Sequence, residues 1–337
     1  MTQRLTGLIA ATYTPMQADG SLKLDAVPKM VDHLAQCGVS GIYIGGSTGE
    51  GMSLTGEERR ELAEAYVAAA KGRLRTIVQV GHNSLVEARQ LAAHAQQIGA
   101  DVISATAPSY YKTTSTQGLI DGMREVAAGA PDLPFYYYHI PALTGAAVDM
   151  AEFREAEASK IPNLVGLKYT APLVHEYQAC QAVNEGAFDI VWGTDEMLLS
   201  ALVVGAHGAI GSTYNIAAPL YLAIIEDYQS KDILRAAQLQ LLAVEMVRLL
   251  CKRPFHAAVK CILGWRGIEC GPCRAPQVSL SQQQKAELQE DLELAGFDKW
   301  LLHLGSDAFV ASPQNANNSS HIPKPHAQRY TTRLTTD

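Results

Sequence analysis

The stretch Asn163–Thr170 reads NLVGLKYT and holds a short apolar run that ends in Lys168. A continuous apolar run without polar alternation is typical of a strand that is buried on both faces of a parallel sheet. Runs of the same kind recur at a steady spacing on both sides of this stretch. The sequence predicts eight strands: Gly7–Thr12, Gly41–Ile44, Arg75–Val80, Val102–Ala105, Pro134–Tyr138, Leu164–Lys168, Asp189–Trp192 and Gly208–Gly211.

Amphipathic helical patterns separate these strands. The predicted helices are Asp25–Gln36, Thr55–Ala70, Ser84–Gln97, Thr116–Ala127, Met150–Ala158, His175–Val183 and Glu196–Val204. Repeated alternation of strand and helix indicates a closed parallel barrel, so the predicted fold class is α/β, a (β/α)8 TIM barrel. The alternative is an open doubly wound sheet, which uses the same alternation.

From Ala217 onward only helical patterns remain until the composition changes. They cover Pro219–Tyr228, Ile233–Leu250, Phe255–Gly264 and Ser281–Leu294. We therefore expect a barrel over residues 1–216 and a C-terminal α-helical extension, packed on the barrel, over residues 217–302. Residues 303–337 are rich in Ser, Thr, Asn, Pro and Gln, a composition typical of segments without fixed structure.

Composition excludes several classes of partner. The 337 residues carry a formal net charge of −7 and no run rich in Lys and Arg, which argues against nucleic acid. No apolar run approaches the ~18 residues that a membrane span requires. The apolar stretch Leu8–Ala11 is too short for the core of a secretory signal. Six scattered cysteines indicate reduced thiols, so the sequence predicts a cytoplasmic protein.

Two further chemistries receive little support from the sequence. Cys270 and Cys273 have the spacing of a redox dithiol, but that chemistry requires the first cysteine at a helix N-terminus directly after a strand. Here the pair follows a predicted helix and leads into a loop. The ten histidines show neither His-x-His nor His-Glu-x-x-His spacing, so we expect no metal site.

Lys168 is the first candidate catalytic residue. Burial disfavours the charged form of an amine and lowers its pKa, which leaves some neutral nucleophile that can condense with a carbonyl to form a Schiff base. The alternative is a lysine whose side chain extends from the strand end into solvent and has no chemical role. Sequence alone leaves both interpretations open.

Further polar groups follow other predicted strands at the same end of the barrel, where active sites of this fold lie. The loop Gly45–Gly51 reads GGSTGEG, and its main-chain N–H groups and two hydroxyls can bind a carboxylate or phosphate, although a tight turn explains it equally simply. In Phe135–Tyr138, alternation places Tyr136 and Tyr138 on one face and Tyr137 on the other. A phenol beside an amine can transfer protons, while packing is the usual role of a strand tyrosine.

Asp195 and Glu196 follow the seventh predicted strand, and Gly211-Ser212-Thr213 follows the eighth. Paired acids at a helix start often serve only as a cap. At the mouth of a barrel, the same pair can accept hydrogen bonds from a polyhydroxylated substrate.

Taken together, five motifs resemble the N-acetylneuraminate lyase and dihydrodipicolinate synthase superfamily of pyruvate-dependent class I aldolases, in order from about Leu5 to Leu301. The motifs are GGSTGE at Gly45–Glu50, YHIP at Tyr138–Pro141, GLK at Gly166–Lys168, and GTDE at Gly193–Glu196 with GSTYN at Gly211–Asn215. The resemblance implies a barrel with a C-terminal helical region, no dissociable cofactor, and a homotetramer.

The resemblance also implies roles for individual residues. Lys168 would form the Schiff base with the keto carbon of pyruvate or a 2-keto acid, and Tyr138 would be the acid and base that relays the substrate's proton. Ser47 and Thr48 would hold the carboxylate, and Tyr110 would reach the site of a neighbouring subunit to complete the relay. The residues implied to contact the sugar-derived chain are Thr170, Gly193, Asp195, Glu196 and Ser212.

The synthase branch has an arginine two residues after the proline of its Tyr-Asn-x-Pro motif, where this chain has Leu143. Without the guanidinium there is no bidentate carboxylate clamp, so the resemblance favours the sialate lyase branch and an N-acetylmannosamine acceptor. Two departures leave the exact sugar open: His139 replaces a common asparagine, and Arg253–His256 lacks the usual glycine.

The expected reaction is therefore reversible aldol cleavage of N-acetylneuraminate. One alternative is a related aldolase or synthase that acts on another 2-keto-3-deoxy acid or an aspartate-semialdehyde-type acceptor. The other is a catalytically silent sensor that binds a keto acid.

Overall fold

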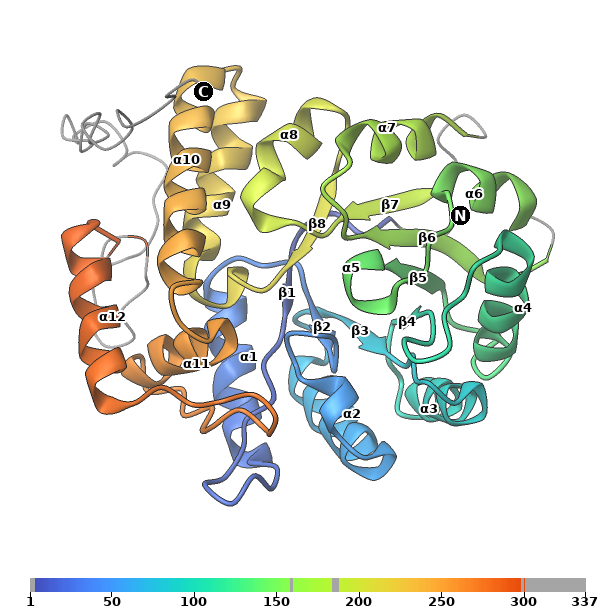
Figure 1. The fold of residues 1–337 in the computed structure, drawn as a ribbon, viewed down its shortest axis with the longest axis horizontal. Coiled ribbons are helices and arrows are strands. Elements are labelled where there is room, and N and C mark those ends of the chain that lie inside the picture. The colour runs from blue at the N-terminus through green and yellow to red at the C-terminus, as the bar shows by residue number, and fades with distance from the viewer. Residues whose placement is uncertain (1–3, 158–159, 184–187, 298–299, 301–337) are drawn as a thin grey trace, which may run out of the picture.

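Eight parallel strands close into a barrel in the order β1 to β8 (Figure 1). The computed structural model describes residues 4–157, 160–183, 188–297 and 300. The strands are β1 (Gly7–Ala11), β2 (Gly41–Ile44), β3 (Arg75–Gln79), β4 (Val102–Thr106), β5 (Phe135–His139), β6 (Leu164–Tyr169), β7 (Asp189–Trp192) and β8 (Gly208–Gly211). Each end lies within one residue of its prediction. The closed barrel is confirmed, and the open doubly wound sheet is wrong.

Helices follow the strands and surround the barrel (Figure 1). Those of the barrel are η1 (Leu24–Ala26), α1 (Val27–Gln36), η2 (Gly51–Ser53), α2 (Gly56–Ala70), α3 (Leu85–Gln97), α4 (Thr116–Ala127), α5 (Pro141–Thr144), α6 (Met150–Glu157), α7 (Val174–Ala182), η4 (Asp195–Met197) and α8 (Leu198–Val203). Helix α2 begins at the capping box of Thr55 and Glu58, which satisfies two backbone donors reciprocally. The sequence did not predict the short helix α5.

In the described part of the chain after β8, four helices pack together at one side of the barrel (Figure 1). They are α9 (Tyr214–Gln229), α10 (Ile233–Leu250), α11 (Phe255–Trp265) and α12 (Gln282–Leu294). The predicted start of the first helix at Pro219 was wrong, because α9 continues across a kink at Ala217. The division of the chain at residue 217 stays a prediction. The tail predicted at 303–337 lies outside the described residues.

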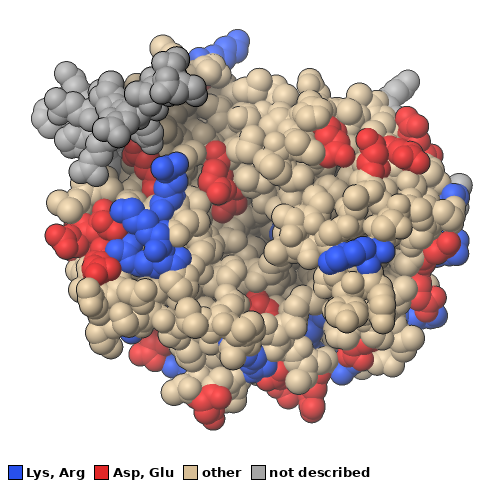
Figure 2. All heavy atoms as spheres, viewed as in Figure 1, with Lys and Arg blue, Asp and Glu red and all other residues tan. Residues whose placement is uncertain are grey.

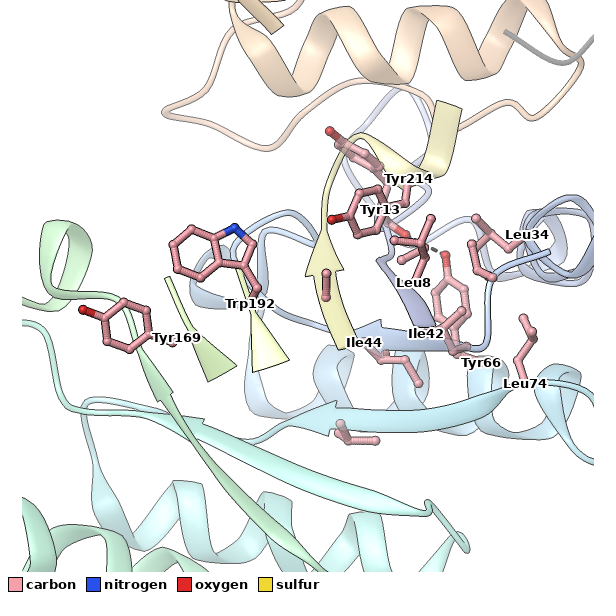
Figure 3. Close-up of a cluster of buried hydrophobic side chains, with 14 of the residues drawn as sticks. Leu8, Tyr13, Leu34, Ile42, Ile44, Tyr66, Leu74, Tyr169, Trp192 and Tyr214 are labelled. Atoms are coloured by element: carbon pink, nitrogen blue, oxygen red, sulfur yellow. Dashed lines mark hydrogen bonds between the residues drawn. The ribbon is translucent and has the colours of Figure 1, made fainter. Parts of the chain in front are cut away.

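The apolar side chains form two layers, one inside the barrel and one between the strands and the helices. The inner layer includes Tyr43, Tyr136 and Tyr138. Figure 3 shows part of the outer layer, in which Tyr66 of α2 donates a hydrogen bond of 2.6 Å to the Tyr13 carbonyl. Strand alternation therefore decides which residues can reach a site inside the barrel.

The alternation predicted for β5 is confirmed. Tyr137 belongs to the outer layer, where its ring centroid lies 5.4 Å from that of Phe153 in α6. Tyr136 and Tyr138 point inward, toward opposite ends of the barrel.

Acidic and basic side chains are interspersed over the face seen in Figure 2, which is hollowed near its centre. Among the described residues, no helix combines the length and apolar character that crossing a membrane requires.

Candidate active site

Strand register brings Lys168 and Tyr138 together. Lys168 of β6 pairs with Tyr138 of β5, and the Lys168 Nζ lies 4.0 Å from the centroid of the Tyr138 ring. A second ring, that of Tyr43 on β2, lies 4.1 Å from the same nitrogen. The two rings meet edge to face, with centroids 5.7 Å apart. The amine therefore contacts the faces of two aromatic rings that lie nearly perpendicular to each other inside the barrel.

Lys168 is buried, with only 4% of its surface exposed, so the alternative of a side chain extended into solvent does not hold. Burial lowers the pKa of Lys168 from its ordinary value of 10.5, while Tyr138, through its charge and a hydrogen bond, and the charge of Asp195 act in the opposite direction. Desolvation is the largest of these effects, which increases the fraction of neutral amine near neutral pH.

The loop after β2 presents Ser47 and Thr48. Ser47 is exposed, whereas Thr48 is buried and its Oγ1 lies 2.6 Å from the Oγ of Ser212, which follows β8. The predicted carboxylate-binding pair and one predicted sugar contact thus lie close together, after the two strands that flank β1.

Glu50 anchors this loop to the C-terminal helices. Its Oε1 lies 2.6 Å from the Nζ of Lys260 in α11, and both side chains are fully buried. Its Oε2 accepts a hydrogen bond of 2.7 Å from the backbone N–H of Arg274. Glu50 adopts a left-handed backbone conformation with φ of 56°, which a non-glycine residue tolerates only when its surroundings hold it there.

Thr170 and Gly193 are adjacent at the ends of β6 and β7. A Cβ at position 193 would lie 1.9 Å from the Thr170 Oγ1, so only glycine permits this approach. The Thr170 Oγ1 is buried and has no hydrogen-bond partner within the described part of the chain. A buried hydroxyl without a partner is available to a ligand.

Asp195 is buried beneath the loop after β8. Its Oδ2 accepts hydrogen bonds from the Thr213 backbone N–H at 2.8 Å and from the Thr213 Oγ1 at 2.6 Å. A Cβ at Gly211 would lie 1.9 Å from the Asp195 Oδ1. Burial raises the pKa of Asp195 to about 6, against the lowering effect of the Thr213 hydrogen bonds. Glu196, the second predicted acid, is only half-buried.

Tyr110 is on the surface, in the loop between β4 and α4, with 76% of its area exposed. Its ring packs edge to face against Tyr111, itself 83% exposed, at a centroid distance of 5.1 Å. The structure thus brings the other predicted residues to the end of the barrel interior and leaves Tyr110 outside that group.

The two departures from the family pattern take different positions. His139 points away from the barrel interior, and its ring centroid lies 5.1 Å from that of Tyr169. Burial lowers the pKa of His139 to about 4, so the ring is neutral at pH 7. His256 of α11 packs against Tyr13, with centroids 5.8 Å apart.

The Cys270 and Cys273 thiols are free and buried, in the segment that leads from α11 into a loop. Burial raises the pKa of Cys270 to about 12 and that of Cys273 to about 11, which disfavours the thiolate that redox chemistry needs. Among the described residues, no group of three or more His, Cys, Asp or Glu side chains is arranged to hold a metal ion.

Sequence reasoning missed Tyr43, Lys260 and Arg274 as parts of this region. Alternation along β2 predicts that Tyr43 points to the opposite side from Ile42 and Ile44, and this was the one available signal. Nothing in the sequence pairs Lys260 or Arg274 with Glu50.

A buried lysine beside a phenol at the end of a parallel barrel defines a site of the Schiff-base aldolase type. The model of the dihydrodipicolinate synthetase family matches residues 4–295. The chain therefore belongs to this family, as the sequence motifs predicted.

Within this family, the chain is similar to proteins named N-acetylneuraminate lyase or sialic acid aldolase. N-acetylneuraminate lyase of Rattus norvegicus is 38% identical over 300 residues, which cover 88% of this chain and 94% of that protein. The structure of N-acetylneuraminate lyase (sialic acid aldolase) from Aliivibrio salmonicida has a TM-score of 0.86 and 37% identity and covers 90% of this chain and 99% of its own. A Ruminococcus gnavus sialic acid aldolase with its catalytic lysine mutated has a TM-score of 0.81 and 28% identity, covering 88% and 98%.

Proposed function

We propose that this protein is a class I aldolase, a carbon–carbon lyase that reversibly cleaves N-acetylneuraminate to pyruvate and N-acetylmannosamine. The observation that carries the proposal is the buried Lys168 amine, 4.0 Å from the Tyr138 ring and with a lowered pKa. The similarity to N-acetylneuraminate lyases, over nearly the full length of the rat protein, supports the choice of substrate.

The first half of the reaction forms the imine. The Lys168 Nζ attacks the C2 keto carbon of the open-chain sugar acid and gives a carbinolamine. Tyr138 donates its proton to the departing hydroxyl, which leaves as water, and a cationic iminium remains beside the Tyr138 phenolate.

The second half breaks the carbon–carbon bond. The Tyr138 phenolate takes the C4 hydroxyl proton, the C3–C4 bond breaks, and its electron pair moves into the iminium to give a neutral enamine. N-acetylmannosamine leaves, Tyr138 returns the proton to C3, and water hydrolyses the new iminium to free pyruvate and Lys168. The proton released in hydrolysis regenerates the Tyr138 phenol.

The remaining site residues bind the substrate in this proposal. Ser47 and Thr48 hold the carboxylate, and the main-chain N–H groups of their loop supply further donors. The contacts to the sugar-derived chain come from Thr170, Gly193, Asp195, Glu196 and Ser212. Asp195 already shares its Oδ2 with Thr213, so its Oδ1 is the atom left for substrate.

The proposed assembly is a homotetramer in which Tyr110 of one subunit completes the proton relay of another. Support comes from the exposure of Tyr110 and Tyr111, because large aromatic side chains are enriched at protein interfaces. Light scattering on Tyr110→Ala, alongside kcat, tests this: a loss of activity in an intact tetramer assigns the relay, and unchanged activity removes it. The six free cysteines support a reducing, cytoplasmic location.

The experiment that tests the reaction is borohydride reduction in the presence of pyruvate, followed by peptide mass spectrometry. The proposal expects a covalent adduct on Lys168 and none in Lys168→Met. An unlabelled Lys168 in the active enzyme would reject the imine mechanism.

A panel of sugar acids, with pyruvate release measured, tests the substrate. We expect turnover of N-acetylneuraminate and little condensation of pyruvate with aspartate semialdehyde, since apolar Leu143 stands where the synthase branch has its arginine. Activity confined to a 2-keto-3-deoxy acid without the amino sugar would replace the proposed substrate but keep the mechanism. Binding of pyruvate without turnover of any substrate would indicate a sensor.

A further inference from the structure

We propose that Tyr43 is a further catalytic residue, whose ring face, next to the ring of Tyr138, stabilises the cationic iminium that forms on Lys168. This inference rests on the proposed function, because it concerns the imine of that reaction. The Lys168 Nζ lies 4.1 Å from the Tyr43 ring centroid and 4.0 Å from that of Tyr138. Both distances are well within the ~6 Å over which an aromatic face attracts a cation.

The cation on Lys168 needs such a partner. No salt bridge to Lys168 occurs within the described residues, and 96% of its surface is buried. An iminium cannot lose its charge until it accepts the electrons of the breaking bond or is hydrolysed. Once the Tyr138 phenolate has taken up the C4 hydroxyl proton, the negative ring faces are the electrostatic compensation that remains beside this charge in a desolvated site.

Ring faces suit this reaction better than a carboxylate would. A carboxylate in contact with the amine would lower the energy of the ammonium strongly and keep the nucleophile protonated. An aromatic face attracts a cation more weakly, so the neutral amine remains accessible for attack while the later iminium is still stabilised. Two ring faces in contact with one nitrogen can therefore leave the amine neutral before the attack and stabilise the iminium after it.

The surroundings hold the Tyr43 ring in place. Its side chain is fully buried, and its hydroxyl donates a hydrogen bond of 3.1 Å to the Ser104 Oγ in β4. A Cβ at Gly46 would lie 2.6 Å from the Tyr43 Cε1, so the glycine leaves the space that the ring occupies. Preorganisation of this kind avoids a reorganisation cost when charge develops.

Tyr43 and Tyr138 therefore have different roles in the proposed reaction. The hydroxyl of Tyr43 is engaged by Ser104, which leaves its ring as the active part. Tyr138 supplies both a ring face and the phenol that transfers protons. Loss of the hydroxyl alone should remove only the hydrogen bond to Ser104 at position 43, whereas at position 138 it removes the group that transfers protons.

The test compares Tyr43→Phe, Tyr43→Leu and a variant with pentafluorophenylalanine at position 43. Fluorination keeps the shape of the ring but removes its negative face. The readout is the fraction of Lys168 trapped by borohydride as a function of pyruvate concentration, measured on protein whose folding is verified by circular dichroism.

We expect Tyr43→Phe to lie within about 3-fold of the wild type, and Tyr43→Leu and the fluorinated variant to lower the apparent equilibrium constant for imine formation by about 10-fold. Equal trapping in the fluorinated and Phe variants would overturn the proposal, and this comparison stands even if Tyr43→Leu fails to fold. Absence of an adduct in the wild type would instead reject the proposed function.

Discussion

Both ends of the barrel interior hold buried polar groups, but the two ends differ in how completely these groups are hydrogen-bonded or ion-paired. At the N-terminal end, the Tyr136 hydroxyl donates to the Asp189 Oδ2 at 2.5 Å, and the Leu5 backbone N–H donates to the same atom at 2.7 Å. The Asp189 Oδ1 lies 2.5 Å from the His207 Nε2. Both carboxylate oxygens thus have partners.

At the C-terminal end, the corresponding groups are left incomplete. Among the described residues, the Lys168 amine has two ring faces and a hydrogen bond to Tyr138 but no salt bridge, and the buried Thr170 Oγ1 has no hydrogen-bond partner. Buried polar groups are normally satisfied, so unsatisfied ones mark a place where a ligand supplies the missing contacts. The comparison separates an end that stabilises the barrel from an end that reacts.

The largest expected effect comes from Lys168→Met, which removes the nucleophile while keeping much of the volume. Activity should fall by at least about 10⁴-fold, the scale of loss when a covalent nucleophile is removed. Stability should rise. Burial lowers the pKa of Lys168 below 10.5, so the unfolded chain binds the proton more tightly and the native protein loses stability as the pH falls from 10.5 to the folded-state pKa.

Urea unfolding of the wild type and Lys168→Met at pH 7 and above pH 10.5 measures this effect. The variant should be more stable at pH 7, and the difference should shrink at the higher pH. A variant that is less stable than the wild type at pH 7 would mean that the amine is well accommodated and the comparison between the two ends is wrong.

The next effect contrasts the two inward tyrosines of β5. Tyr138→Phe should lower kcat by about 10²- to 10³-fold through loss of the proton relay. Tyr136→Phe should cost about 1–2 kcal/mol of stability through loss of one donor to Asp189, with kcat within about 3-fold of the wild type. Steady-state kinetics and urea unfolding on both variants check these two expectations. Equal losses of kcat would show that the two ends of the barrel do not differ in function.

Asp189→Ala tests the stabilising end more strongly. It removes the acceptor of three hydrogen-bonded groups, so we expect a loss of about 3 kcal/mol in the free energy of unfolding. The activity of the remaining folded protein should stay within about 3-fold, because Asp189 is at the opposite end from Lys168. His207→Ala is the milder control, since its ring is partly exposed.

The sequence predicted those parts of the fold that depend on local pattern. All eight strands were placed within one residue because each is an apolar run bounded by polar or glycine residues. The start of α9 was missed because Pro219 lacks the N–H that a helix interior uses, and the kink at Ala217 that accommodates it is a tertiary feature.

The sequence predicted only those site residues that lie at the ends of consecutive strands. Lys168 and Tyr138 end consecutive strands, and consecutive strands are neighbours in such a barrel. Tyr43 lies in the apolar run GIYI, where a tyrosine usually indicates packing. The ion pair of Glu50 and Lys260 joins distant parts of the chain, and no local pattern in a single sequence specifies such a contact.

The smallest expected effect is a shift of the pH profile in Asp195→Asn. The Asp195 anion raises the pKa of Lys168, so its replacement by a neutral amide should move the acid limb of adduct formation to lower pH, by less than about one unit. Because burial raises the pKa of Asp195 to about 6, its carboxylate costs stability above its ordinary pKa of 3.8, and the full cost is reached only above about pH 6.

The stability of the wild type relative to Asp195→Asn should therefore fall as the pH rises from 4 to 8, whereas the asparagine Oδ1 can still accept from Thr213. The matched control is Asp189→Asn, the same substitution at the other end of the barrel. Asp189 is not among the charges that act on Lys168, so this control should leave the acid limb in place. Borohydride trapping with pyruvate from pH 5 to 9 measures the acid limb of adduct formation in both variants. Equal shifts in the two variants, or a shift of Asp195→Asn to higher pH, would show that Asp195 does not tune the amine.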